Sequence, residues 1–377
     1  MRQFLRKRIP LLLCLLLIVT LIAGCNAPEG PSYEVGRIRN IVLIIGDGMG
    51  PSHVQMGELA LGEEFVFHNW HHTSCNTNSL SVLNQPTVTT DSAASATAMA
   101  TGVLTKNNKV GLNADGESLK TILDFASQDY GKRTGVVTTD LLSGATPASF
   151  TAHSVSRTAA GIILDSQSRS GVHLLCSDLT EGTKELAEAE GYAFCDDYSK
   201  IGDTMSAGKT YWQFAMSGAT PKQSLATVSV DALNYLSQGE YGFVLMIEQA
   251  YVDKFSHSND AEGALACVLS LNETVKAVLN WVGDRNDTLI LVTADHETGG
   301  LQISRDPIYD QSLTSGQGNT VYYQFTDTDH TSTMVDLYVY GIQPDFATLS
   351  YDNDPAYIKN TAIFEIMMDA LKNPNQP

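Results

Sequence analysis

Nearly continuous apolar runs alternate with segments of helical periodicity along most of the chain. The runs 41–45, 243–247 and 288–293 are hydrophobic at almost every position, which is typical of strands buried on both faces of a parallel sheet. Two weaker patterns, 134–139 and 172–176, predict further strands.

Between these strands, apolar side chains recur every three or four residues, which predicts amphipathic helices. The helical patterns begin at 119, 183 and 224, follow the capping pair Asn259–Asp260, and close the chain at 363–371. No internal repeat occurs, and no linker divides residues 38–372. We therefore expect one α/β domain over 38–377, a three-layer αβα arrangement with a central, mostly parallel sheet.

The segment 89–102 consists almost entirely of small residues, and its Ser92 directly follows Asp91. Such a sequence predicts a tightly packed helix with Ser92 in the first turn, beside free N–H groups that suit an anion. Two interpretations are open from this segment alone. Ser92 is either a helix cap, which is the commoner role, or a nucleophile that carries a phosphoryl group.

The composition is that of an ordinary globular protein, with 43% hydrophobic and 17% charged residues among 377. The 23 basic and 42 acidic residues give a net charge of −19. So acidic a body repels nucleic acid and anionic lipid, so neither is expected as a partner. An anionic substrate would need local positive charge, from metal ions or a well-placed arginine.

The first residues read as a targeting signal. Basic residues between positions 2 and 8 precede the apolar run 11–22, which is too short and wrongly flanked for a spanning helix. The run ends in Leu-Ile-Ala-Gly-Cys25, which resembles the lipobox of bacterial lipoproteins. That resemblance implies a signal peptide over 1–24, a lipid on Cys25, a polar tether over 25–37, and an extracytoplasmic protein whose only membrane contact is this lipid. Plain secretion is the alternative.

Four cysteines remain once Cys14 in the signal and Cys25 are set aside. They are Cys75, Cys176, Cys195 and Cys267. Outside the cytoplasm they could form disulfides, with Cys176 and Cys195 the closest pair in sequence. Their connectivity stays open, and none has the spacing of a structural zinc site.

Several of the predicted strands end in carboxylate or imidazole side chains. Asp47 follows 41–45, Glu248 follows 243–247, and Asp295 and His296 follow 288–293. Each residue alone is more often a turn or cap. In open α/β sheets, however, ligands bind at the carboxyl ends of strands, where these residues would converge. Carboxylate and imidazole groups without cysteine suit a catalytic zinc site.

The same residues fall in segments that resemble those of the alkaline phosphatases, in that family's order. The segments are 45–50, 90–98, 145–147, 253–257, 293–300 and 330–331. Their resemblance extends over roughly residues 40 to 340. It implies an alkaline-phosphatase-like fold and hydrolysis of phosphate monoesters through a phosphoserine at Ser92.

The resemblance also implies a set of metal ligands. One Zn²⁺ would be held by Asp253, His257 and His330. A second Zn²⁺ would be held by Asp47, Asp295, His296 and the nucleophile Ser92. One Mg²⁺ would be held by Asp47, Thr146 and Glu248.

Three further residues would contact the substrate. Arg157 matches the arginine that clamps phosphate, since a guanidinium can grip two phosphoryl oxygens at once. Asp91 precedes the nucleophile, and Lys254 would reach phosphate through water.

One position departs from the family pattern. The family often has an acidic residue or histidine two positions before the threonine of the magnesium site, and here that position is Gly144. This predicts a weaker or more hydrated third metal site. The short stretch 297–329 predicts that an elaborate interfacial insertion is absent, while the natural substrate and a homodimer stay open.

Two other functions are alternatives to phosphate monoester hydrolysis. Phosphodiesterases and sulfatases of the same superfamily tend to use threonine or a modified residue as nucleophile and lack this arginine, so Ser92 with Arg157 favours monoesters. A non-catalytic envelope protein that binds phosphate or metal would not need the nucleophile at all.

Overall fold

The computed structural model describes residues 38–351 and 354–372, which belong to one compact unit. The predicted signal peptide, Cys25 and the tether lie outside the described residues and stay predictions. None of the helices in the described part is both long enough and apolar enough to cross a membrane.

Eleven strands of the described chain form one sheet, in the order β15-β16-β2-β14-β8-β1-β7-β3-β4-β6-β5. They are β1 (Asn40–Gly46), β2 (His71–Asn76), β3 (Arg133–Thr138), β4 (Leu174–Ser177), β5 (Ala193–Cys195), β6 (Thr210–Gln213), β7 (Phe243–Gln249), β8 (Thr288–Thr293), β14 (Val335–Tyr340), β15 (Ser350–Tyr351) and β16 (Asp354–Lys359). From β8 through β1 to β5, all neighbours are parallel, whereas β14 runs antiparallel to β8 and β2. The predicted mostly parallel sheet is confirmed.

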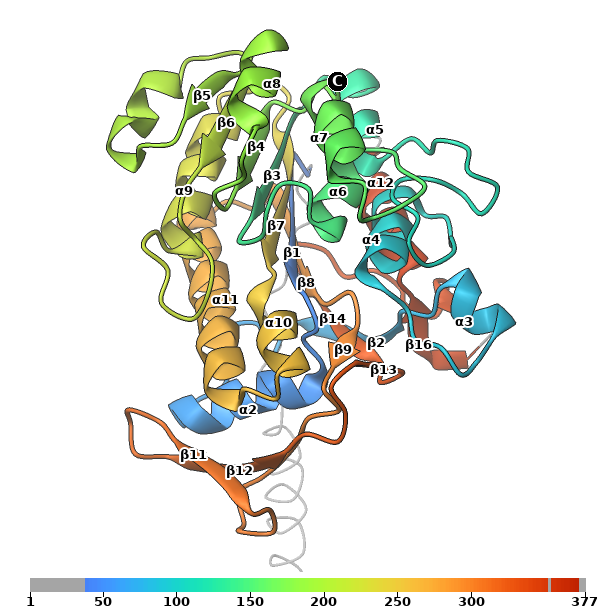
Figure 1. The fold of residues 1–377 in the computed structure, drawn as a ribbon, viewed down its shortest axis with the longest axis vertical. Helices are drawn as coiled ribbons and strands as arrows, with labels where there is room; N and C mark the ends of the chain where they lie inside the picture. The colour runs from blue at the N-terminus through green and yellow to red at the C-terminus, as the bar shows by residue number, and fades with distance from the viewer. Residues whose placement is uncertain (1–37, 352–353, 373–377) are drawn as a thin grey trace, which may run out of the picture. The chain divides into compact units, whose positions relative to one another are not determined.

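Helices cover both faces of this sheet, as the three-layer prediction requires. They are α2 (Pro51–Leu61), α3 (Leu80–Asn84), α4 (Ser92–Thr101), α5 (Ile122–Gln128), α6 (Ala145–Thr151), α7 (Ala160–Ser168), α8 (Thr183–Ala189), η1 (Tyr198–Thr204), α9 (Leu225–Leu236), α10 (Tyr251–His257), α11 (Ala261–Val282) and α12 (Thr361–Leu371). In Figure 1, α9 and α11 lie on one face of the sheet, and α4, α6 and α12 lie on the other. Both faces of the central strands are therefore buried, which explains their continuous hydrophobicity.

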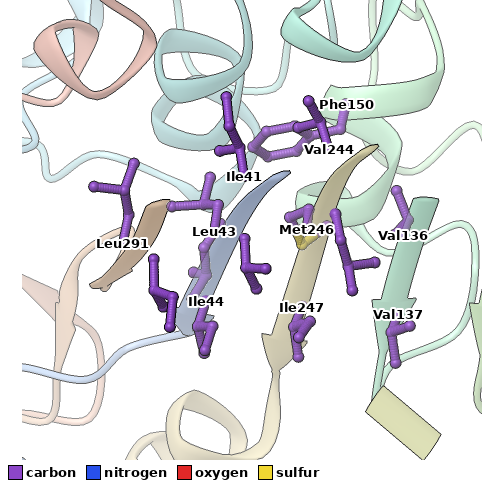
Figure 2. Close-up of a cluster of buried hydrophobic side chains, with 14 of the residues drawn as sticks. Ile41, Leu43, Ile44, Val136, Val137, Phe150, Val244, Met246, Ile247 and Leu291 are labelled. Carbon is purple, nitrogen blue, oxygen red and sulfur yellow. The ribbon is translucent and has the colours of Figure 1, made fainter. Parts of the chain in front are cut away.

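The core centres on β1, every residue of which is buried. Figure 2 shows Ile41 and Leu43 of β1 beside Val244 and Met246 of β7, with Leu291 of β8 on the other side. The register puts Ile45 of β1 level with Glu248 of β7. All three strands thus end at one edge, where the polar residues begin.

Two small sheets follow β8. One consists of β10 (Gln302–Ser304), β12 (Thr320–Gln324) and β11 (Gln311–Thr314), and the other pairs β9 (Glu297–Thr298) with β13 (His330–Thr331). The second pairing puts His330 level with Thr298, two residues after His296. It carries a distant part of the chain back to the edge of the main sheet.

Two expectations need correction. The helix predicted from position 119 begins at Ile122, because Thr121 and Asp124 form a capping box that leaves Leu119 in the preceding loop. The four described cysteines are free and buried. Cys176 and Cys195 flank Trp212 from opposite sides of β6, so two strand spacings, about 9.5 Å, separate them, which is too far for a disulfide.

Candidate active site

Ser92 is the first residue of α4, but it does not cap the helix. Asp91 is the cap, and its Oδ1 accepts a hydrogen bond from Ala94 N at 2.9 Å. The Ser92 hydroxyl instead lies 3.1 Å from Nε2 of His296, and the residue is only 3% exposed. The helix-cap interpretation of Ser92 is therefore wrong, and its oxygen faces an imidazole at the edge of the sheet.

Small side chains let α4 pack closely on its neighbours, and all ten of its residues are buried. Ser149 of α6 donates a hydrogen bond to the carbonyl of Ala93 at 3.1 Å. Ser95 of α4 donates to the carbonyl of Asp295 at 2.7 Å. The helix that carries Ser92 is thus tied directly to the segment that follows β8.

Asp253, His257 and His330 form one cluster of potential metal ligands, with one ligand atom of each within 4.8 Å of the others. Asp253 and His257 lie one turn apart on α10, and the β9–β13 pairing brings in His330. Nδ1 of His257 lies 2.7 Å from the Thr328 carbonyl, and Nδ1 of His330 lies 2.8 Å from that of Thr90. Because a carbonyl only accepts, each Nδ1 carries a proton, and each Nε2 faces Asp253 Oδ1, at 3.3 Å for His257 and 3.6 Å for His330.

Asp47, Asp295 and His296 form a second, fully buried cluster with the same spacing. Asp295 Oδ1 accepts from the backbone N–H of Gly48 at 3.1 Å and of His296 at 3.0 Å, which leaves Oδ2 facing the imidazole at 3.2 Å. Gly48 has φ of 73°, and a β-carbon there would lie 2.7 Å from the Cα of Asp253. This glycine therefore permits the two clusters to approach each other.

Three buried oxygens at this edge have no hydrogen-bond partner: Asp47 Oδ1, Asp295 Oδ2 and Thr146 Oγ1. Buried polar atoms are normally paired, since an unpaired one costs about 1–3 kcal/mol. Glu248, 1% exposed at the end of β7, is the fourth carboxylate of the site, and Thr138 donates a hydrogen bond to it. These unpaired oxygens, together with the imidazole nitrogens that face the carboxylates, fit divalent cations.

The repulsion among the buried carboxylates of the site also favours the binding of cations. Burial raises the pKa of Asp47, and the charges of Asp295, Asp253 and Glu248 raise it further. Burial and the Asp140 charge raise the pKa of Glu248 to about 8. A hydrogen bond to Asp253 raises the pKa of His257 to about 9. Bound cations would relieve this repulsion among buried carboxylates.

Two predicted substrate contacts lie at the rim. Arg157 is one-third exposed, with Nη1 3.4 Å from Asp91 Oδ2, while its backbone N–H donates to the Asn108 carbonyl at 2.9 Å. The guanidinium thus pairs with the helix cap Asp91, the residue that precedes Ser92. Lys254 pairs with Asp140 and lies 4.4 Å from the centre of the Tyr251 ring.

Sequence reasoning missed Asp140, Thr138 and Thr298. Thr298 donates to Asp253 Oδ1 at 2.6 Å and lies 3.2 Å from Nδ1 of His296, so it joins the two clusters. Asp140 follows a predicted strand, as Asp47 does, and that signal was available in the sequence. Nothing local in the sequence marks Thr298.

The family described as alkaline phosphatase matches residues 38–186 and 209–368. The chain belongs to the alkaline phosphatase family. This alkaline phosphatase is 30% identical over 354 residues to alkaline phosphatase 3 of Bacillus subtilis (strain 168), across 82% of this chain and 73% of the relative. It is 26% identical over 386 residues to the alkaline phosphatase of Escherichia coli (strain K12), across 80% and 81%.

Solved structures match as well. The alkaline phosphatase from the Antarctic bacterium TAB5 has a TM-score of 0.75 at 22% identity, over 90% of this chain and 99% of that one. A variant of the TAB5 enzyme with Mg bound in the M3 site has a TM-score of 0.76 at 21% identity over the same shares. The alkaline-phosphatase-like fold is confirmed, and this alkaline phosphatase is a metal-binding phosphate monoester hydrolase.

Proposed function

We propose that this alkaline phosphatase hydrolyses phosphate monoesters through a phosphoserine at Ser92, in a site for two Zn²⁺ and one Mg²⁺. The observation that carries the proposal is the 3.1 Å approach of the Ser92 hydroxyl to His296, a member of the buried cluster. One Zn²⁺ is assigned to Asp253, His257 and His330. The second is assigned to Asp47, Asp295 and His296, with Ser92.

The third site would take Asp47, Thr146 and Glu248, whose oxygens suit Mg²⁺. The unpaired Thr146 Oγ1 and the TAB5 variant with Mg in its M3 site support this assignment. When bound, the metal ions would supply positive charge that lowers the pKa of the serine hydroxyl and of water and neutralises the leaving oxygen.

The residues of this chain supply the nucleophile and the groups that bind the phosphoryl oxygens. Ser92 Oγ attacks phosphorus, an Oγ–P bond forms, and the bond from phosphorus to the leaving oxygen breaks. The Arg157 guanidinium grips two phosphoryl oxygens, and the N-terminus of α4 adds its own N–H groups. Water then attacks the phosphoserine, which releases inorganic phosphate and restores the hydroxyl.

Replacement of the nucleophile tests the covalent route. Ser92→Ala should lower kcat for p-nitrophenyl phosphate at least ~1,000-fold and abolish labelling by ³²P-phosphate in acid-quenched protein. Ser237→Ala, an exposed serine at the end of α9, is the matched control and should behave as the wild type. If Ser92→Ala kept near-full, EDTA-sensitive turnover, the phosphoserine would be excluded.

Substrate comparison separates this activity from those of the wider superfamily. Because Arg157 can hold two non-bridging oxygens of a dianionic phosphoryl group, monoesters should be turned over far faster than diesters or sulfate esters. Comparable turnover of a diester would contradict the proposed role of Arg157.

We also propose that the protein is extracytoplasmic and anchored through a lipid on Cys25. This rests on the basic start, the apolar run 11–22 and the lipobox-like ending. In a bacterial host, Cys25→Ser should move phosphatase activity from the membrane fraction to the soluble fraction. Activity that stays with the membranes would count against lipidation.

A further inference from the structure

Gly144 is a glycine for reasons of space. Its φ of −53° and ψ of 150° are open to any residue with a side chain, so the backbone does not demand glycine. A β-carbon there would lie 2.6 Å from Asp140 Oδ2 and 3.1 Å from its Cγ. The carboxylate of Asp140 therefore occupies the place that a side chain at position 144 would take.

Asp140 is held on two sides. Its Oδ1 accepts a hydrogen bond from Nζ of Lys254, the residue after Asp253. Its backbone N–H donates to Thr138 Oγ1 at 2.9 Å, and the same hydroxyl donates to the carboxylate of Glu248. Asp140 thus joins the end of β3 to both α10 and the end of β7.

We propose that Asp140 is a positioning residue of the third metal site, in place of a side chain at position 144. It orients Lys254 toward the phosphate site, and its carboxylate accepts hydrogen bonds from water on the ion held by Thr146 and Glu248. The proposal rests on the proposed function of these residues. It reverses the expectation that Gly144 weakens the site.

The chemistry of the ion explains the need for such an acceptor. Mg²⁺ takes six oxygens, and Asp47, Thr146 and Glu248 would supply three, so water fills the rest. Those waters donate hydrogen bonds outward and require acceptors in fixed positions. Loss of a partner in this outer layer typically costs 10–100-fold in metal affinity.

Metal uptake tests the proposal without relying on turnover. Protein loaded with Zn²⁺ is titrated with Mg²⁺ by equilibrium dialysis, and both metals are counted by mass spectrometry. Asp140→Ala should bind Mg²⁺ about 10–100-fold more weakly and keep its Zn²⁺, while the Ki of inorganic phosphate rises. Asp140→Asn keeps the packing and removes only the charge, and it should weaken Mg²⁺ in the same direction.

Rescue distinguishes positioning from a general structural role. Gly144→Asp in the Asp140→Ala background returns a carboxylate to the vacated space and should restore at least tenfold in Mg²⁺ affinity. Gly144→Asp alone, which crowds two like charges, should weaken Mg²⁺. The matched control is Asp129→Ala, which removes a surface carboxylate paired with Lys120 at 2.8 Å and should change nothing.

Three results would overturn the proposal: Asp140→Ala with wild-type Mg²⁺ affinity, a double variant without rescue, or wild-type protein that takes up no Mg²⁺. The first two outcomes are separate from a failure of the proposed function, whereas an absence of Mg²⁺ uptake by the wild type would also refute the proposed third metal site. A Ser92 that is never phosphorylated would refute the phosphoserine route and leave the Mg²⁺ titration intact.

Discussion

Each imidazole of the site has an oxygen behind it that orients the ring. For His257 and His330 this oxygen is a backbone carbonyl, and for His296 it is the hydroxyl of Thr298. A backbone carbonyl remains when the side chain of its residue is substituted, whereas a side-chain hydroxyl is lost. Thr298, which also donates to Asp253, is therefore the most vulnerable support of the two clusters of potential metal ligands.

Thr298→Val keeps the shape of this fully buried side chain and removes its hydrogen bonds. We expect zinc affinity to fall roughly 10–100-fold, because both His296 and Asp253 lose their orientation. Competition with a chelator measures this. Thr314→Val, an exposed threonine on β11, is the control, and equal zinc affinity in the two variants would contradict the supporting role.

His53 makes stability depend on pH. Its Nδ1 accepts from Gly50 N–H at 3.2 Å, so Nε2 carries the proton and faces Ser256 Oγ at 2.9 Å. This arrangement suits only the neutral ring. Burial lowers the pKa of His53 from 6.5 to about 4, although the charge of Asp253 opposes the shift.

Between pH 6.5 and 4, His53 is therefore protonated in the unfolded chain but stays neutral in the folded chain. The free energy of unfolding consequently falls as the pH falls. The loss from this residue is at most about 3 kcal/mol. Urea unfolding of metal-free protein across this range should show a flatter pH dependence in His53→Gln than in the wild type. The exposed control His72→Gln should keep the wild-type slope, and identical slopes in all three would refute the assignment.

Among the elements, α4 has small side chains that let the neighbouring helix α6 pack close to its backbone. Its alanines, serines and threonines are all buried, and the hydroxyl of Ser149 on α6 reaches its backbone. Ala-rich sequence usually signals helix propensity, but here small size matters more, because larger side chains would push α6 away from the Ser92 helix.

A larger side chain late in α4 should therefore be costly. Ala100 is fully buried, two turns beyond Ser92. Ala100→Leu should lower the free energy of unfolding by about 1–3 kcal/mol through overpacking. Met99→Leu conserves volume at the neighbouring position and should cost less than about 1.5 kcal/mol, as denaturant unfolding would show. Equal costs for the two variants would mean that α4 is not tightly packed.

Across the whole molecule, the candidate metal ligands come from segments far apart in the chain that meet at one sheet edge. Asp47 follows β1, Glu248 ends β7 and Asp295 follows β8, while α10 and β13 bring Asp253 and His330. Without cations, these buried carboxylates repel one another. The metal ions would hold the ends of several elements together.

Removal of metal should therefore lower stability as well as activity. We expect EDTA to reduce Tm by several degrees, and Zn²⁺ with Mg²⁺ to restore it, because ligands that bind only the folded state stabilise it by mass action. Scanning calorimetry before and after chelation measures the shift. An unchanged Tm would mean that the ions do not bridge the elements.

Local pattern was enough for the elements near the site. The runs at β1, β7 and β8 are apolar because both faces of the sheet are covered, and the polar residues after them mark its edge. Short or amphipathic pieces such as β2, β5, β6 and α6 carry weaker signals and were not predicted. Leu119 fits a helical period but lies outside α5, because the capping box at Thr121 overrides periodicity.

The sequence by itself thus determined the types of the candidate site residues, their order and their positions after buried strands. It could do so because burial of a strand on two faces and the chemistry of metal ligands both produce local sequence patterns. The sequence did not determine which residue each of them contacts. Thr298 lies beside Nδ1 of His296, and the pairing of β13 with β9 brings His330 to the site. The Asp140 carboxylate occupies the space that a side chain at Gly144 would take. These contacts arise only when distant segments pack together, and packing in three dimensions has no counterpart in neighbouring positions of a sequence.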